Sequence, residues 1–189
     1  MTASIPESAK PLAERMRPRN ISEVIGQPQL LGPDTAFSRA LHEGRLHSAI
    51  LWGPPGTGKT TLARLLAKHT QASFIALSAV MSGVKDIRAA LEQGRDNLQH
   101  QKKTILFIDE IHRFNKSQQD AFLHAMENGE IILIGATTEN PSFALNNALL
   151  SRARVYILKS LDQDAIVTLL RRALNDPERG VKLKVSDEV

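Results

Sequence analysis

A glycine-rich octapeptide carries the clearest chemical signal in the chain. It consists of Gly53, Pro54, Pro55, Gly56, Thr57, Gly58, Lys59 and Thr60, and it fits the pattern G-x-x-x-x-G-K-T. Gly56 and Gly58 let successive backbone N–H groups approach phosphate oxygens, while the helix predicted to follow points the positive end of its dipole at the same anion. Lys59 adds a cation at the outer phosphates, and Thr60 offers a hydroxyl to Mg²⁺. The octapeptide, with Thr61 after it, therefore predicts a site for ATP and Mg²⁺ rather than a plain strand-to-helix turn.

Two neighbouring acids supply the second part of this chemistry. Asp109 and Glu110 end the apolar run ILFIDE, about fifty residues after Lys59. Asp109 is expected to hold Mg²⁺ beside Thr60, and Glu110 to polarise the water that attacks the γ-phosphate. The competing interpretation is a solvated acid pair at a strand end, which the P-loop upstream disfavours.

A third polar group follows the run IILIGATT. Thr138 is chosen there because its hydroxyl, at the carboxyl edge of a sheet, could reach the γ-phosphate or its water. The alternative is a Thr-rich turn that merely ends the strand before Pro141.

The elements that would position these residues alternate between β-prone runs and helical stretches from Ser48 onward, as in a parallel α/β sheet. The runs AILW, ILFI and IILI are continuously apolar, which predicts central strands of a doubly wound P-loop fold. We expect an extended N-terminal arm over 1–33, an ATPase core over 34–159 and a new helical segment over 160–189. Ser160 is expected to cap the first helix of that segment, and Ser186 to cap another.

The bulk composition fits a folded intracellular protein. The chain has 189 residues, 42% of them hydrophobic, a net charge of +4 and no cysteine. No apolar run approaches the roughly 18 residues of a membrane span, and no signal-peptide core is present. We therefore expect no membrane contact and a cytoplasmic location. Arg113 and Lys116 are candidates for DNA contact, although an exposed basic face explains them equally well.

The motifs GPPGTGKT, ILFIDE, GATTEN and LLSRAR, in this order, resemble those of the AAA+ ATPases, especially the branch with clamp-loader subunits and the Holliday-junction branch-migration motor. Longer stretches, among them DEIHRFNKSQQDAFLHAMENG, are more similar to the replication-associated recombination protein A family, which includes the Werner helicase-interacting protein. The resemblance covers the chain from residue 11 onward. It implies a DNA-dependent ATPase at stalled replication forks, near the nucleoid, that forms homo-oligomers and has single-stranded or forked DNA and single-stranded-DNA-binding protein as partners.

The resemblance also implies roles for residues that spacing alone leaves open. Thr138 corresponds to sensor 1, and Arg152 to an arginine finger that acts on the nucleotide of a neighbouring subunit, with Arg154 as a weaker candidate. The adenine pocket is expected at Arg17, Pro18, Val24 and Ile25. Residues 160–189 would begin a helical lid, whose remaining helices and sensor 2 arginine would follow residue 189 in a longer protein.

Three other functions stay open at this stage. A nucleotide-gated scaffold would bind ATP without needing Glu110 or Arg152. A clamp-loader-like or branch-migration motor subunit would share the same motifs. A small-molecule kinase is disfavoured because the paired acids suit a water nucleophile and no second substrate pocket is evident.

Overall fold

The computed structural model describes residues 9–181, and their contacts divide the chain into two units. Unit 1 combines residues 1–26 with 161–189, and unit 2 covers Gln27–Ser160. The elements in chain order are α1 Leu12–Arg15, the 3₁₀ helix η2 Ile21–Glu23, α2 Pro28–Leu31, α3 Ala36–His42, β1 Ala49–Trp52, α4 Lys59–His69, β2 Ser73–Ser78, α5 Val84–Gln99, β3 Thr104–Asp109, η3 Ile111–Arg113, α6 Lys116–Glu127, β4 Ile132–Thr137, α7 Pro141–Ala144, α8 Asn147–Leu150, β5 Arg154–Ile157 and α9 Gln163–Asn175.

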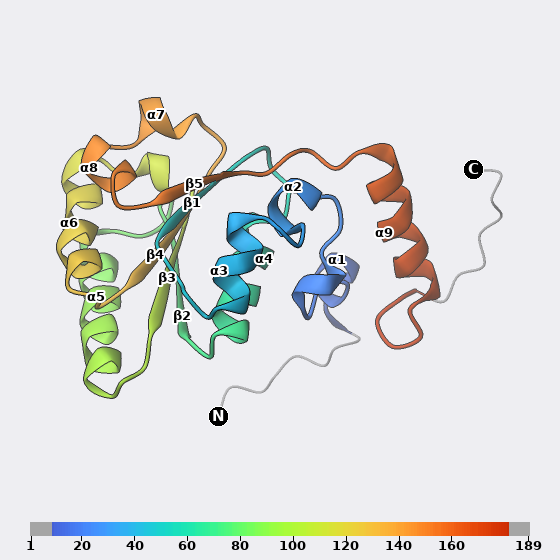
Figure 1. The fold of residues 1–189 in the computed structure, drawn as a ribbon, viewed down its shortest axis with the longest axis horizontal. Helices are drawn as coiled ribbons and strands as arrows, with labels where there is room; N and C mark the ends of the chain where they lie inside the picture. The colour runs from blue at the N-terminus through green and yellow to red at the C-terminus, as the bar shows by residue number, and fades with distance from the viewer. Residues whose placement is uncertain (1–8, 182–189) are drawn as a thin grey trace. The chain divides into compact units, whose positions relative to one another are not determined.

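The centre of unit 2 is a five-stranded parallel sheet in the order β2-β3-β4-β1-β5. The predicted α/β class is confirmed, and so is the placement of the three continuously apolar runs as the central strands β3, β4 and β1. Their inner residues are almost fully buried because helices cover both faces. Figure 1 shows α5 and α6 on one face and α3 with α4 on the other.

The main core lies between the sheet and helices α5 and α6. Ile50, Leu106 and Leu133 point from alternate positions of three strands toward Ile87 of α5 and Phe122 of α6. Gln118 and Asn115 form a capping box at the start of α6, with hydrogen bonds of 2.9 and 3.0 Å between side chain and backbone. This core fixes the carboxyl ends of the strands, where the candidate site lies.

The segment up to residue 33 differs from the extended arm that the sequence predicts. Three short helical turns, α1, η2 and α2, occupy it. Local capping explains the middle one, because Asn20 accepts a hydrogen bond from the Glu23 N–H at 3.2 Å. The prediction of an extended conformation is therefore wrong for this part of the chain.

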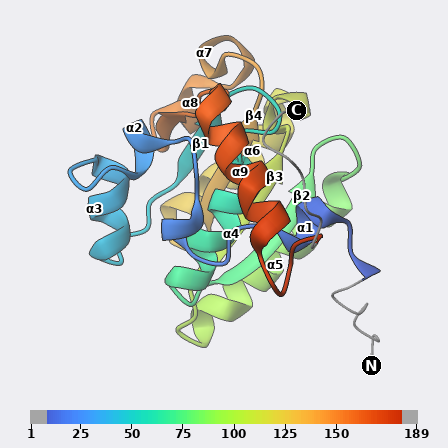
Figure 2. The same ribbon diagram turned by 90° about the vertical axis from the view of Figure 1, so that its right-hand side faces the viewer.

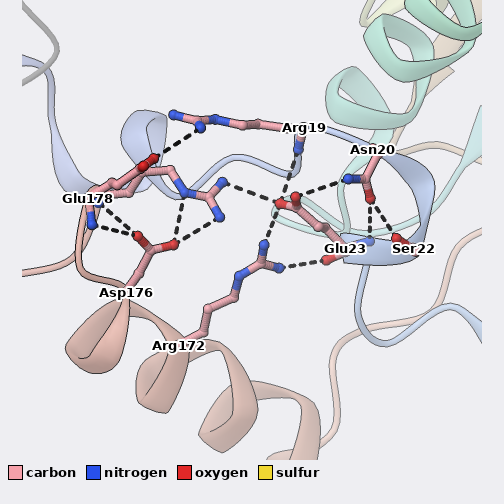
Figure 3. Close-up of polar contacts among 8 residues, drawn as sticks. Arg19, Asn20, Ser22, Glu23, Arg172, Asp176 and Glu178 are labelled. Carbon is pink, nitrogen blue, oxygen red and sulfur yellow. Dashed lines mark hydrogen bonds and ion pairs between the residues drawn. The ribbon is translucent and has the colours of Figure 1, made fainter.

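The two parts of unit 1 are held together by ion pairs. Glu23 contacts the guanidinium groups of Arg172 in α9 and of Arg179 just after it, the latter at 3.2 Å (Figure 3). Asp176 in turn accepts from Arg179 at 2.9 Å. Helix α9 runs straight in both ribbon views (Figures 1 and 2).

Helix α9 begins two residues later than a Ser160 cap would require. Asp162 is the N-cap and accepts from the Ala165 N–H at 2.8 Å, so the prediction of Ser160 as the cap is wrong. A carboxylate at this position also complements the helix dipole. The predicted helix start at Ser186 lies outside the described residues. No helix in residues 9–181 has the length and apolarity to cross a bilayer.

Candidate active site

The glycine-rich octapeptide forms the turn between β1 and α4. Gly56 and Gly58 have φ angles of +77° and +93°, and Gly58 is the N-cap of α4. Apart from its chain neighbours, no described residue has an atom within 4 Å of a Cβ built at either position, so backbone conformation rather than crowding requires glycine there. The first hydrogen bond within the helix runs from the Leu62 N–H to the Gly58 carbonyl, at 2.9 Å. The N–H groups that precede Leu62 in the helix have no acceptor within it. This arrangement suits an anion at the helix start.

Position 53 requires glycine for a different reason, which is close packing. A Cβ there would lie 2.3 Å from the Leu158 carbonyl oxygen, just beyond β5. Its N–H donates to the Thr137 carbonyl at 3.1 Å, at the end of β4. The first residue of the P-loop is therefore packed tightly between two neighbouring strand ends.

Lys59 folds back over the P-loop. Its Nζ donates to the carbonyls of Gly53 at 2.7 Å and Pro54 at 2.8 Å, and the residue is only 7% exposed. Burial lowers the pKa of Lys59, while the charges of Glu110 and Asp109 act in the opposite direction. The structure thus brings the predicted cation and both predicted carboxylates into one electrostatic environment.

The two acids lie at the carboxyl end of β3. Asp109 ends the strand opposite Ser78 of β2, and Glu110 follows with a left-handed backbone, φ +54°. A non-glycine residue in this conformation is strained by roughly 1–2 kcal/mol, and such strain is concentrated at functional sites. The Thr138 hydroxyl donates to Glu110 Oε2 at 3.2 Å. Thr138 therefore lies beside the acid that is expected to polarise water.

A buried histidine completes this cluster, and the sequence reasoning did not find it. His112 Nε2 lies 3.4 Å from Glu110 Oε2 and 3.3 Å from Glu139 Oε1. Its Nδ1 lies 2.9 Å from the Thr137 hydroxyl, and its side chain is 6% exposed. A histidine two residues after a catalytic acid is the signal that could have suggested it.

Gln27 is the second residue that the sequence reasoning missed. It is 2% exposed, and its amide N–H group donates to the Lys159 carbonyl at 2.8 Å and to the Thr57 carbonyl at 3.3 Å. Its amide oxygen accepts from the Lys159 N–H at 3.1 Å. Gln27 thus fastens the P-loop backbone to the chain that follows β5.

The two candidate arginines are not brought to the phosphate site. Arg154 pairs with Ala49 at the amino end of β1, whereas the P-loop follows Trp52, roughly 10 Å further along the strand. Arg152 binds Glu127 instead, with Nη2 and Nε at 2.5 and 2.8 Å from the same oxygen. An action of Arg152 on its own P-loop is not supported by this geometry.

The four residues of the predicted adenine pocket lie in unit 1, and all are half-buried. Arg17 pairs with Glu14 at 2.5 Å, and Val24 ends η2. Their role at adenine stays a prediction.

The donor set fits Mg²⁺ bound together with a nucleotide. Thr60 and Asp109 offer hard oxygen ligands, which Mg²⁺ prefers in combination with phosphate oxygens and water. Within residues 9–181 no group of three or more His, Cys, Asp or Glu side chains is arranged to hold a metal alone. The protein would supply one or two ligands, and the triphosphate the others.

Comparison with known proteins points to the same chemistry. The family described as ATPases associated with various cellular activities (AAA) matches residues 49–161. Replication-associated recombination protein A of Escherichia coli K12 is 58% identical over 171 residues, 90% of this chain but 38% of that protein. The ATPase WRNIP1 of Dictyostelium discoideum is 54% identical over 89% of this chain and 19% of that protein. The chain therefore spans under two fifths of the length of these relatives.

A solved structure confirms the fold. The Holliday junction branch migration motor RuvB of Thermotoga maritima superimposes with a TM-score of 0.70 at 30% sequence identity, over 85% of this chain and 54% of that one.

Proposed function

The chain belongs to the AAA family of ATPases, and from this premise we propose that it binds MgATP and hydrolyses it to ADP and phosphate as the core of a DNA-dependent ATPase. The observation that carries the proposal is the convergence of Lys59, Asp109, Glu110 and Thr138 at one edge of the sheet. No other cluster in residues 9–181 combines a phosphate cradle with a carboxylate for water.

Each residue has a separate task in this proposal. The amides of the P-loop and Lys59 hold the β- and γ-phosphates, and Thr60 and Asp109 hold Mg²⁺. Glu110 accepts a proton as water attacks the γ-phosphorus, and the bond to the β–γ bridging oxygen breaks, with ADP as the leaving group. The Thr138 hydroxyl keeps the Glu110 carboxylate in place. Bound Mg²⁺ supplies charge neutralisation at the phosphates.

The wider role is proposed from the relatives. Replication-associated recombination protein A is named for replication and recombination, and we infer the same setting for this chain: DNA at replication forks, in the cytoplasm near the nucleoid. Assembly into a homo-oligomer would give Arg152 a nucleotide in a neighbouring subunit. Single-stranded or forked DNA, with its binding protein, is the proposed partner.

Replacement of Glu110 by glutamine in the full-length protein tests the reaction. The variant should bind ATP as the wild type does, while phosphate release falls by roughly 10²–10⁴-fold, the usual contribution of a general base. Glu92→Gln, on the exposed side of α5, is the matched control. Phosphate release should be measured without DNA, with single strands and with forks.

The outcomes separate the candidate functions. Unchanged hydrolysis in Glu110→Gln would reject Glu110 as the water activator. A wild-type protein that binds ATP, recruits partners and releases no phosphate with any DNA would support the nucleotide-gated scaffold instead.

A further inference from the structure

We propose that His112 is a positioning residue that fixes the Glu110 carboxylate for water activation, an inference that rests on the proposed ATPase function. His112 lies in η3, directly after the acids, and its side chain is 6% exposed. Both of its ring nitrogens face polar groups of the site rather than the apolar core. Any buried imidazole needs polar partners, but here one of the partners is Glu110 itself.

The contacts assign the protons of this group. Nε2 faces one oxygen each of Glu110 and Glu139, at 3.4 and 3.3 Å, and ionised carboxylates only accept hydrogen bonds. For a neutral imidazole, the proposal places the ring hydrogen on Nε2, toward these two oxygens. Nδ1 is then an acceptor, and the Thr137 hydroxyl at 2.9 Å donates to it.

Thr137 is well placed to donate a hydrogen bond to His112. It is fully buried, and its hydroxyl oxygen accepts from the Glu139 N–H at 3.1 Å. Its single hydrogen is then available to His112 at 2.9 Å, a closer acceptor than the Glu139 carbonyl at 3.2 Å. The backbone carbonyl of the same residue accepts from Gly53, the first residue of the P-loop. One residue of β4 thereby links the histidine to the phosphate cradle.

Glu110 is consequently held from two sides. Thr138 donates a hydrogen bond to Oε2 from the more exposed side, and His112 Nε2 lies 3.4 Å from the same oxygen on the buried side. Its other oxygen, Oε1, is left to accept the proton of the attacking water. The backbone of Glu110 is held between β3 and η3, and its side-chain contacts then fix the direction of the carboxylate.

The test compares His112→Ala, His112→Gln and His112→Asn in the full-length protein. The amide of glutamine reaches the position of Nε2 and can donate to Glu110, whereas the amide of asparagine reaches only that of Nδ1. We expect His112→Ala to lower kcat by about 10- to 100-fold, the usual effect of losing a hydrogen bond to a charged group, with the Kd for ATP within about twofold of wild type. Glutamine should restore much of the rate, and asparagine should not. His100→Ala is the control, because His100 is exposed at the end of α5 and its Nδ1 lies 2.8 Å from the Asp96 carbonyl of the same helix.

The position of the hydrogen on the His112 ring is also measured by NMR, in the absence of ATP turnover. The ¹⁵N resonances of His112 should report a hydrogen on Nε2, and Thr137→Val should alter this pattern because it removes the donor to Nδ1. The melting temperatures of all variants show whether each one folds. If alanine prevents folding, the glutamine and asparagine variants decide between the outcomes.

The inference is overturned if His112→Ala turns over ATP at the wild-type rate, or if the folded glutamine and asparagine variants lose equal activity. A hydrogen on Nδ1 would equally overturn it. Glu110→Gln, measured in parallel, keeps the two proposals distinct: if that variant hydrolyses ATP at the wild-type rate, the assignment of Glu110 has failed, and if the wild type releases no phosphate, the proposed function itself has failed.

Discussion

Lys59 is the residue whose surroundings say most about nucleotide binding. Its ammonium group is buried against two backbone carbonyls, and burial lowers its pKa despite the nearby Glu110 and Asp109. A buried ammonium group is stabilised by an anion that takes the place of solvent beside it. The phosphates of ATP are such an anion, and the open helix start of α4 lies beside them.

Replacement of Lys59 by methionine is therefore expected to weaken ATP binding itself. The loss should be about 10- to 100-fold in Kd, the range for hydrogen bonds to a charged group. Titration with a fluorescent ATP analogue measures it, with Lys85→Met on the exposed surface of α5 as control. Equal affinities for the Lys59 variant and the wild type would contradict the assigned role.

Some residues of this site depend on contacts within one short segment, and others on contacts with residues far away in the sequence. Gly56, Gly58 and Lys59 could be predicted because one short segment holds all their geometry. Thr138 could be proposed from its strand end, but its bond to Glu110 joins residues 28 positions apart. Gln27 bonds Lys159 across 132 positions, and no local pattern records such a contact.

At the scale of elements, the central position of three strands could be predicted from the sequence and the helix boundaries could not. Continuous apolar runs marked β1, β3 and β4 because both faces of those strands are covered. Two potential caps compete before α9, and the sequence does not show that Asp162 rather than Ser160 adopts the extended conformation of an N-cap. Among the N-terminal turns, η2 has a side-chain cap, Asn20, whereas α1 and α2 have no side-chain cap.

Gln27 shows how an element boundary supports the site. It bridges the P-loop at Thr57 and the chain after β5 at Lys159, away from water. Gln27→Ala would leave buried carbonyl and N–H groups without partners, which costs about 1–3 kcal/mol. We expect a lower urea midpoint and a weaker affinity for ATP, because the P-loop amides lose a fixed support. Gln93→Ala, exposed on α5, is the control, and a variant as stable as the wild type would show that water replaces the amide.

In unit 1, an ion cluster joins η2 to α9 (Figure 3). Here the link is made by charged groups rather than by an amide. Burial alone would raise the pKa of Glu23. The Arg19 N–H and the guanidinium groups of Arg179 and Arg172 outweigh that effect, so the pKa falls below its ordinary value of 4.5. A carboxyl group with a lowered pKa in the folded state stabilises the fold at pH values above its unfolded pKa.

This contribution should disappear as the solution becomes acidic. Glu23→Gln is expected to lower the free energy of unfolding by about 1–3 kcal/mol at pH 7, since it removes charged hydrogen bonds from two arginines. The difference from wild type should begin to shrink as the pH falls through the unfolded-state pKa of about 4.3, and it should vanish only below the lowered pKa of the folded state. Urea titrations at pH 7 and at pH 3.5 give both values. Glu178→Gln, at an exposed position, serves as the control. The predicted pH dependence would be contradicted if the difference in unfolding free energy between Glu23→Gln and the wild type grew toward acid pH.

At the scale of the whole molecule, the proposed role of Arg152 requires a second chain, because in this chain Arg152 pairs with Glu127. Its partner in the structure is Glu127, and both side chains are well exposed, at 39% and 48%. Exposed ion pairs of this kind contribute only about 0.2–1 kcal/mol. The phosphate of a neighbouring subunit could therefore replace Glu127 at little cost. Sequence alone could suggest this role only by resemblance, because the contact requires a second chain.

Mixed oligomers of the full-length protein test whether Arg152 acts in trans. Arg152→Ala keeps its own P-loop but lacks the proposed arginine finger, and Lys59→Met binds ATP weakly but keeps the arginine. Each variant alone should release phosphate at least about 100-fold more slowly than wild type, because an arginine finger contributes about 10³–10⁵-fold where it has been measured. Mixing the two should restore a measurable fraction of the rate, since some Arg152→Ala sites then face an intact Arg152. A mixture with the double variant Lys59→Met and Arg152→Ala should restore none, and an Arg152→Ala protein that is fully active alone would show that hydrolysis needs no arginine from a neighbour.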